Sequence, residues 1–256
     1  RRRSRPRAGV RLVTLGGFAV HRDGRPLPDS AFGRQKARAL LAMLACARGA
    51  VHREALVDGL WPDLSAKRGL AALNSTLYAL RRGLEPELAA GDSSSLVVAE
   101  GPTYRLVLGE ADSWDAADFL ARARAALAAP GDVDALLAAE AAWTGPFLPE
   151  WTFAPWTEPL RTELGEAHRA VLVGAAEALA AAGRAEEAIS RYRLLLAMEP
   201  EREGWHRALM RVYARAGERG LALRQFEACR RALREGLGVE PSRETRDLHA
   251  ELLREG

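Results

Sequence analysis

Residues 65–84 read SAKRGLAALNSTLYALRRGL, the most informative stretch for the architecture of the first half of the chain. When successive residues are placed about 100° apart, its leucines fall within about 80° of arc. These leucines are Leu70, Leu73, Leu77, Leu80 and Leu84. Ser65 is a residue type favoured at a helix N-cap, and Pro86 follows the last leucine. The pattern predicts an amphipathic helix over 65–84 whose leucines face a core.

The opposite face of this helix carries cations, hydroxyl groups and small residues, with no acidic residue before Glu85. Its members are Lys67, Arg68, Ala71, Ala72, Ser75, Tyr78, Ala79 and Arg82. Small residues let a helix approach a groove closely, arginine can bind guanine through two hydrogen bonds, and hydroxyl groups can reach phosphates or base edges. A solvated helix face usually mixes Glu with Lys or Arg. The absence of acids therefore favours a nucleic-acid surface over an ordinary solvated one.

Two further helices and two hairpins are predicted around this helix, from apolar spacing and turn residues. The predicted elements are two short antiparallel strands from Val10 onward with their turn at Asp23-Gly24, helices at 33–48 and 52–60, and a hairpin with strands at 96–99 and 104–108. Helices followed by a hairpin, with the last helix basic, describe a winged helix-turn-helix.

The second half of the chain shows only helical signals. The predicted helices cover residues 114–129, 132–143, 155–182, 185–198, 202–216, 219–236 and 243–254. Gly183, Ala188 and Tyr192 recur 34 positions later as Gly217, Ala222 and Phe226, which is the tetratricopeptide period, with a chance match in alanine-rich helices as the alternative. The predicted fold is mainly α: an N-terminal winged helix-turn-helix with small antiparallel β hairpins, followed by an all-α tetratricopeptide-like domain.

The distribution of charge supports two domains with different partners. The 256 residues include 37 basic and 34 acidic side chains. Residues 1–110 hold 18 basic and 10 acidic residues, a net charge of +8, whereas residues 111–256 hold 19 and 24, a net charge of −5. A basic half next to an acidic half indicates a polyanion-binding domain, with chance unevenness as the alternative. We expect a basic arm or linker over 1–9, a DNA-binding domain over 10–110 and a helical domain over 111–256.

These features resemble the Streptomyces antibiotic regulatory protein (SARP) family, in which an OmpR-like winged helix precedes a bacterial transcriptional activation domain. In the first half the matching stretches are GRQKARALLA at 33–42, LVDGLW at 56–61 and LNSTLYALRRGL at 73–84. In the second half they are AWTGPFL at 142–148, Trp156 with Arg161 and Leu164, EPERE at 199–203 and LGVEP at 237–241. The similarity covers about residues 10–254.

The resemblance implies a transcriptional activator that binds direct repeats in double-stranded promoter DNA, one protomer per repeat. It implies that helix 65–84 enters the major groove, that copies associate on tandem repeats, and that the protein contacts RNA polymerase or its sigma factor. One departure concerns the wing, where OmpR-like proteins often carry arginine just before the turn. Glu100 stands at that place, so no minor-groove arginine is expected there.

We predict two sets of DNA-contacting residues on this basis. The residues expected to contact bases or the groove are Arg68, Ser75, Tyr78 and Arg82. The residues expected to contact phosphates are Arg34, Lys36, Arg38 and Lys67. Phosphate contacts make affinity fall steeply with salt, whereas base contacts give sequence preference.

No catalytic residue, metal site or cofactor is predicted. The sequence has no Walker A run, dinucleotide-binding glycine pattern or nucleophile elbow, and its five histidines and two cysteines lack metal-ligand spacing. Two clusters are interpreted as structural: the acids Asp112, Asp115 and Asp118 as helix-capping groups, and the aromatics Trp143, Trp151, Phe153 and Trp156 as packing between helices.

The sequence also indicates a compartment and leaves two alternative functions open. No apolar run approaches the roughly 20 residues of a membrane span, and Cys46 and Cys229 fit core thiols of a reducing compartment, so a cytoplasmic protein without a membrane partner is expected. One alternative is a protein-interaction scaffold, which would show no salt-dependent binding to duplex DNA. The other is an effector-gated output module of a larger ATPase regulator, which a P-loop outside these residues would support.

Overall fold

The computed structural model describes residues 9–33, 35–89 and 91–254, and the chain forms two compact units. The first unit extends to Phe119 and includes Thr144–Leu164. The second comprises Leu120–Trp143 and the residues from Gly165 onward. Arg34 and residues 1–8 of the predicted basic arm lie outside the described residues.

The first unit begins with a small sheet. Its strands β1 (Val10–Val13), β2 (Ala19–Arg22), β3 (Arg25–Pro26) and β7 (Ser113–Trp114) lie in the order β3-β2-β1-β7, with β7 parallel to β1. The predicted antiparallel hairpin with its turn at Asp23-Gly24 is confirmed by β2 and β3, but a turn at Gly16-Gly17 divides the first predicted strand into β1 and β2. Gly16 has a φ of 81°, and a Cβ there would lie 2.9 Å from the carbonyl oxygen of Thr144. Both the turn and this close approach require glycine.

Asp115, the first residue of α4 (Asp115–Leu127), fastens the end of β1. Its carboxylate accepts hydrogen bonds from the backbone N–H groups of Thr14 and Leu15, each at 2.9 Å, and from the Thr14 hydroxyl at 2.7 Å. It also accepts a hydrogen bond from the Ala116 N–H group of its own helix at 2.8 Å. The carboxylate therefore combines the expected helix-capping role with a long-range link to the opening sheet.

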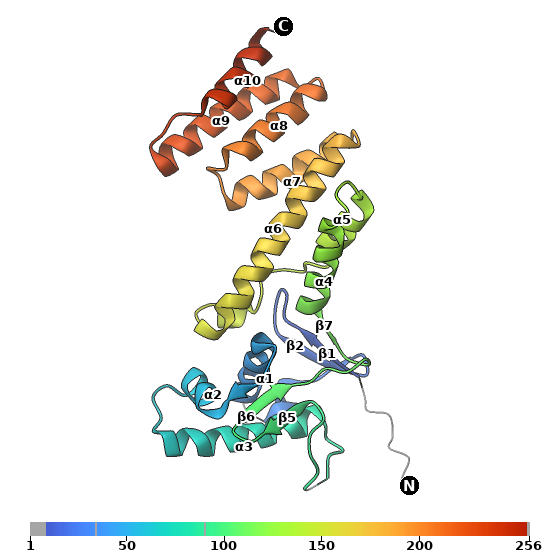
Figure 1. Ribbon diagram of the computed structural model, residues 1–256, viewed down its shortest axis with the longest axis vertical. Helices are drawn as coiled ribbons and strands as arrows, with labels where there is room; N and C mark the ends of the chain where they lie inside the picture. The colour runs from blue at the N-terminus through green and yellow to red at the C-terminus, as the bar shows by residue number, and fades with distance from the viewer. Residues whose placement is uncertain (1–8, 34, 90, 255–256) are drawn as a thin grey trace. The chain divides into compact units, whose positions relative to one another are not determined.

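The same unit contains a helix-turn-helix followed by a hairpin (Figure 1). Its elements are α1 (Gln35–Ala47), β4 (Val51–His52), α2 (Arg53–Leu60), α3 (Ala66–Leu84), β5 (Val97–Glu100) and β6 (Thr103–Leu106), with the strands in the order β4-β6-β5. Leu73, Leu77, Leu80 and Leu84 of the predicted stripe are buried, and Leu70 is half-buried. These elements confirm the predicted winged helix-turn-helix.

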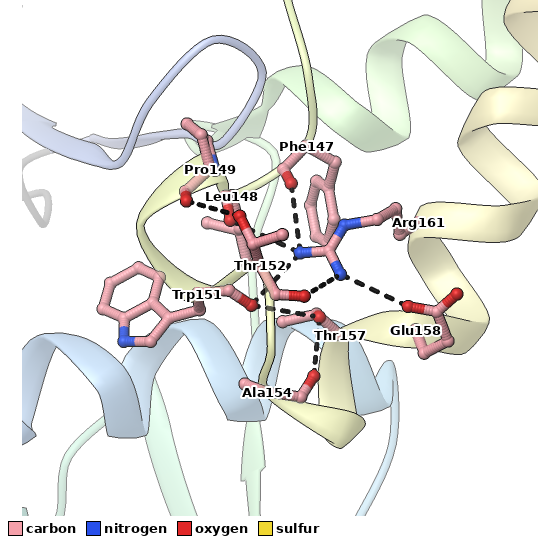
Figure 2. A network of polar contacts seen from close by, with 9 residues as sticks. All are labelled: Phe147, Leu148, Pro149, Trp151, Thr152, Ala154, Thr157, Glu158 and Arg161. Carbon is pink, nitrogen blue, oxygen red and sulfur yellow. Dashed lines mark hydrogen bonds and ion pairs between the residues drawn. The ribbon is translucent and has the colours of Figure 1, made fainter.

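Arg161 lies in the first turn of α6 (Glu158–Ala181) and binds the loop that precedes this helix. Figure 2 shows its guanidinium donating hydrogen bonds to backbone carbonyl oxygens of the loop and pairing with Glu158. The acceptors are the carbonyl groups of Thr152 at 2.9 Å, Trp151 at 3.2 Å, Leu148 at 3.4 Å and Phe147 at 3.5 Å. One charged donor thereby ties together several carbonyl groups of the loop, two of which also accept backbone hydrogen bonds, at Leu148 and Trp151.

The four aromatic residues of the predicted cluster differ in how they pack. Trp151 and Trp156 lie with ring centroids 6.1 Å apart, but Trp143 stacks on His168 in the second unit at 4.3 Å. Phe153 is 96% exposed. The interpretation of all four residues as packing groups was therefore wrong for Phe153.

The second unit is a series of helices that stack as antiparallel neighbours, as α7 to α10 show in Figure 1. The unit includes the part of α4 from Leu120 onward and the part of α6 from Gly165 onward. Its complete helices are α5 (Val133–Ala141), α7 (Ala185–Met198), α8 (Glu203–Arg215), α9 (Arg219–Leu237) and α10 (Arg243–Arg254). The repeat residues Ala188, Ala222, Tyr192 and Phe226 are buried in one core, as the 34-residue period predicts. Among the described residues, no helix combines the length and apolarity needed to cross a membrane.

Candidate nucleic-acid interface

The exposed face of α3 carries two cations and an aromatic ring. Lys67 and Arg68 are exposed in the first turn, and Tyr78 is 69% exposed further along the helix. Neither cation makes a hydrogen bond or an ion pair with a described residue. Both charges and the phenol ring are therefore available to an external ligand.

The far end of α3 is fixed to the hairpin by buried polar contacts. The Glu85 carboxylate accepts hydrogen bonds from the hydroxyl groups of Ser94 and Ser95, the latter at 2.6 Å. The Arg81 guanidinium donates to the carbonyl oxygen of Val97 at 3.0 Å. Burial raises the pKa of Glu85, but the serine hydrogen bonds outweigh it and hold the pKa below its usual value. Glu85 thus remains a carboxylate that couples the helix to the wing.

The other predicted groove residues are partly engaged within the protein. The Ser75 hydroxyl donates to the carbonyl oxygen of Ala72 at 2.9 Å, the back-bond typical of serine within helices. Arg82 is exposed, but its guanidinium also donates to the carbonyl oxygen of Leu88 at 2.9 Å. Both residues remain predictions for DNA contact, and each would have to exchange an internal hydrogen bond for an external one.

The predicted phosphate contacts divide in a similar way. Lys67 is exposed, whereas the Lys36 ammonium donates to the carbonyl oxygen of Leu60 at 2.6 Å. The Arg38 side chain is 21% exposed, pairs with Asp29 at 2.8 Å, donates to the Phe18 carbonyl oxygen and lies over the Phe18 ring. Its contacts give it a structural role at the start of α1. Arg34 lies outside the described residues, and all four phosphate contacts stay predictions.

A hollow of about 380 Å³ lies beside the second half of α3 and adds a residue that the sequence reasoning missed. Asn74, Tyr78 and Arg82 line it from the helix, and Tyr104 lines it from β6. Asn74 is exposed and lies one turn before Tyr78 on the same face. An asparagine amide can pair with adenine through two hydrogen bonds. Its position seven residues after Lys67 was the signal that could have placed it there.

The wing tip carries a neutralised carboxylate. Glu100 and Arg105 of the paired strands β5 and β6 form an ion pair at 2.8 Å, and both side chains are more than 40% exposed. The hydroxyl of Thr103 donates to the Glu100 carbonyl oxygen and closes the turn. The ion pair reduces the repulsion that an isolated Glu100 would exert on a phosphate, and it also occupies Arg105.

Known proteins similar to this chain are transcriptional regulators. Residues 111–253 match the family described as bacterial transcriptional activator domain. The transcriptional regulatory protein MoaR1 of Mycobacterium tuberculosis is 31% identical over 253 residues, which cover 96% of this chain and 80% of MoaR1. The chain belongs to the SARP family. It is a SARP-type transcriptional regulator, and its curated relatives are regulatory proteins rather than enzymes.

Two longer SARP proteins are similar over nearly the whole chain. The regulatory protein AfsR of Streptomyces coelicolor is 31% identical over 252 residues, 95% of this chain but 24% of AfsR. The solved structure of Mycobacterium tuberculosis EmbR in complex with a low-affinity phosphopeptide has a TM-score of 0.81 and 29% identity, and the match covers 97% of this chain and 66% of EmbR. The SARP fold predicted from the sequence is thereby confirmed.

Proposed function

We propose that this SARP protein is a sequence-specific activator that binds promoter DNA by inserting α3 into the major groove. The observation that carries the proposal is the exposed, acid-free face of a helix whose opposite side is buried leucine. A helix fits the major groove, and a rigid core behind it fixes the register of its side chains. Residues 10–110 would be the DNA-binding domain and residues 111–256 the activation domain.

The side chains of α3 would have separate roles. Arg68 and Arg82 would contact guanine edges, Tyr78 a base or the sugar–phosphate backbone, and Lys67 a phosphate. Ser75 would contribute only after releasing the Ala72 carbonyl group. Arg34, Lys36 and Arg38 would flank the helix with positive charge.

The proposed partners beyond DNA are RNA polymerase or its sigma factor and further copies of the protein on tandem sites. The net charge of −5 over residues 111–256 supports a partner other than DNA for that part of the chain. The match covers 24% of AfsR. Activities that need the rest of that longer protein are therefore not proposed for this chain. Such a regulator would act in the cytoplasm, where the chromosome lies.

The test is a titration of DNA from upstream of the protein's own gene cluster, located first by footprinting. Arg68→Ala and Arg82→Ala should each weaken specific binding by about 1–3 kcal/mol, roughly five- to 150-fold. Arg215→Ala, an exposed arginine at the end of α8, is the matched control and should leave affinity within about twofold. Lys67→Ala should instead lower the slope of log affinity against log salt by about one.

Two results would contradict the proposal. Unchanged specific affinity in Arg68→Ala and Arg82→Ala would mean that α3 does not read the site. Absence of salt-dependent binding to any duplex would favour the protein-interaction scaffold.

A further inference from the structure

The second unit contains a pocket between the end of α4, the loop that follows it, and α6. Its volume of about 600 Å³ lies within the range of small-molecule sites. Leu127 from α4, Pro130 from the loop and Leu136 from α5 form one wall. The other wall is a stretch of α6 where Ala170 and Gly174 stand one turn apart, so short side chains leave the space open.

Gly174 shows how closely the two walls are matched. A Cβ at this position would lie 3.0 Å from Leu136 Cδ2 and 3.7 Å from Leu127 Cδ2. The missing side chain therefore keeps the floor of the pocket open between two leucines. Leu127 is also 39% exposed, which places an apolar side chain at the mouth.

Charge distinguishes this pocket from a generic apolar hollow. Three of its thirteen lining residues are ionisable: Glu166, Arg169 and Glu177. The Arg169 guanidinium is paired with Glu199 at 3.0 Å, and the same carboxylate also pairs with Arg202. Neither Glu166 nor Glu177 makes a hydrogen bond or an ion pair with a described residue. The two unpaired carboxylates give an otherwise apolar site a negative rim.

The two glutamates stand at opposite ends of the pocket floor. They are eleven residues apart on α6, which is three turns and about 16 Å along one face of the helix. The small residues of the floor lie between them. An apolar body lying on that floor would place a cationic end beside one glutamate or the other.

We infer that this pocket binds an apolar molecule bearing a protonated amine. The hydrophobic body would be buried against Leu127, Leu136 and Val173, and the ammonium group would pair with Glu166 or Glu177 at the rim. An anion of the same shape would face two carboxylates, while the lining arginine is already paired. This inference does not depend on DNA binding, since every residue that it uses lies in the second unit.

Two fluorescent probes with one body and opposite charges test the inference on the full chain. Dansylcadaverine carries a primary ammonium on a five-carbon linker, and dansyl-aminohexanoic acid carries a carboxylate on a linker of similar length. Titration should show saturable binding of the amine with a blue-shifted emission. The carboxylate probe should bind at least about fivefold more weakly, because it meets like charges at the rim.

Three variants and one control distinguish the contribution of the pocket's shape from that of its charge. Glu166→Gln with Glu177→Gln should weaken the amine probe about three- to tenfold and reduce the preference between the two probes, whereas Glu251→Gln on α10 should change nothing. Ala170→Phe should remove binding of both probes by filling the floor. Leu127→Arg, at a partly exposed position at the mouth, should shift the preference towards the carboxylate.

Three outcomes would overturn the inference. The first is the absence of saturable binding for either probe. The second is equal affinity of the wild-type protein for the two probes. The third is unchanged binding in both Ala170→Phe and Leu127→Arg, which would place the probe elsewhere.

Discussion

The crossing of α2 and α3 at Gly69 is the contact that sets the position of the α3 face. A Cβ at residue 69 would lie 2.3 Å from Val57 Cγ1, and Val57 is buried. Valine is branched at Cβ and has one strongly preferred rotamer in a helix, so it cannot turn aside cheaply. Gly69→Ala should therefore push the two helices apart or force Val57 off its rotamer.

The magnitude follows from two opposing effects. Alanine in place of glycine within a helix stabilises by about 0.5–1 kcal/mol. Overpacking a close contact of this kind costs about 1–3 kcal/mol. Because both the 2.3 Å approach and the stiff valine favour the upper part of the cost, we expect Gly69→Ala to lower the free energy of unfolding by up to about 2.5 kcal/mol. In a Val57→Ala background the obstructing methyl group is gone, so the same change should raise that free energy by about 0.5–1 kcal/mol.

The assay is urea unfolding of the four proteins of this double-mutant cycle, followed by circular dichroism. The predicted reversal of sign corresponds to a coupling energy of about 2 kcal/mol. Gly204→Ala in α8, where a Cβ meets no atom within 4 Å, is the control and should not destabilise. If Gly69→Ala changed the free energy of unfolding equally in the wild-type and the Val57→Ala backgrounds, the crossing described here would be refuted.

Two predictions concern pH and the hairpin anchor. Burial lowers the pKa of His168 to about 4, so the folded state favours the neutral ring; the free energy of unfolding should be flat at high pH and fall below the unfolded pKa of about 6.5, by about 1–2 kcal/mol between pH 7 and 5. His168→Phe keeps an aromatic ring against Trp143 and should remove that loss in urea unfolding at the two pH values, and an unchanged pH dependence would contradict the assignment. Glu85→Ala leaves the hydroxyl groups of Ser94 and Ser95 without their acceptor and should cost about 1–3 kcal/mol at pH 7. Wild-type stability in Glu85→Ala would show that the wing is not coupled to α3 through this carboxylate.

The predictable part of the fold is the part with a regular period. The leucine stripe of 65–84 and the 34-residue repeat each bury one face of a helix, so the sequence alone locates them. β7 has only two residues and pairs with β1 about a hundred positions away. No local pattern marks so short a parallel strand. The Gly16-Gly17 turn was missed because the flanking residues favour strands on both sides of it.

The site was harder to predict because a charged side chain can turn inward or outward. Arg38 has the composition of a phosphate contact, yet its guanidinium is held by Asp29 and the Phe18 carbonyl group. Those partners come from other elements and leave no trace near residue 38. Asn74 carries no charge, so a prediction based on cations and hydroxyl groups does not include it. Phe153 was expected to pack between helices because three tryptophans lie near it in the sequence, and the structure leaves it exposed.

Directed cleavage of DNA from the surface of α3 shows whether this helix lies in the groove. Ala71 is exposed between Arg68 and Tyr78, and Ala250 on α10 is an exposed control. Burial raises the pKa of Cys46 and Cys229 to about 12, so neither native thiol should react near neutral pH. Ala71→Cys and Ala250→Cys can each be labelled with an iron–EDTA reagent and bound to the footprinted fragment.

The label at residue 71 should cut the DNA within the protected base pairs. Any cuts from the label at residue 250 should fall at other base pairs than those cut from residue 71. If the protein labelled at residue 71 protects its site and yet produces no cuts inside it, α3 does not lie in the groove.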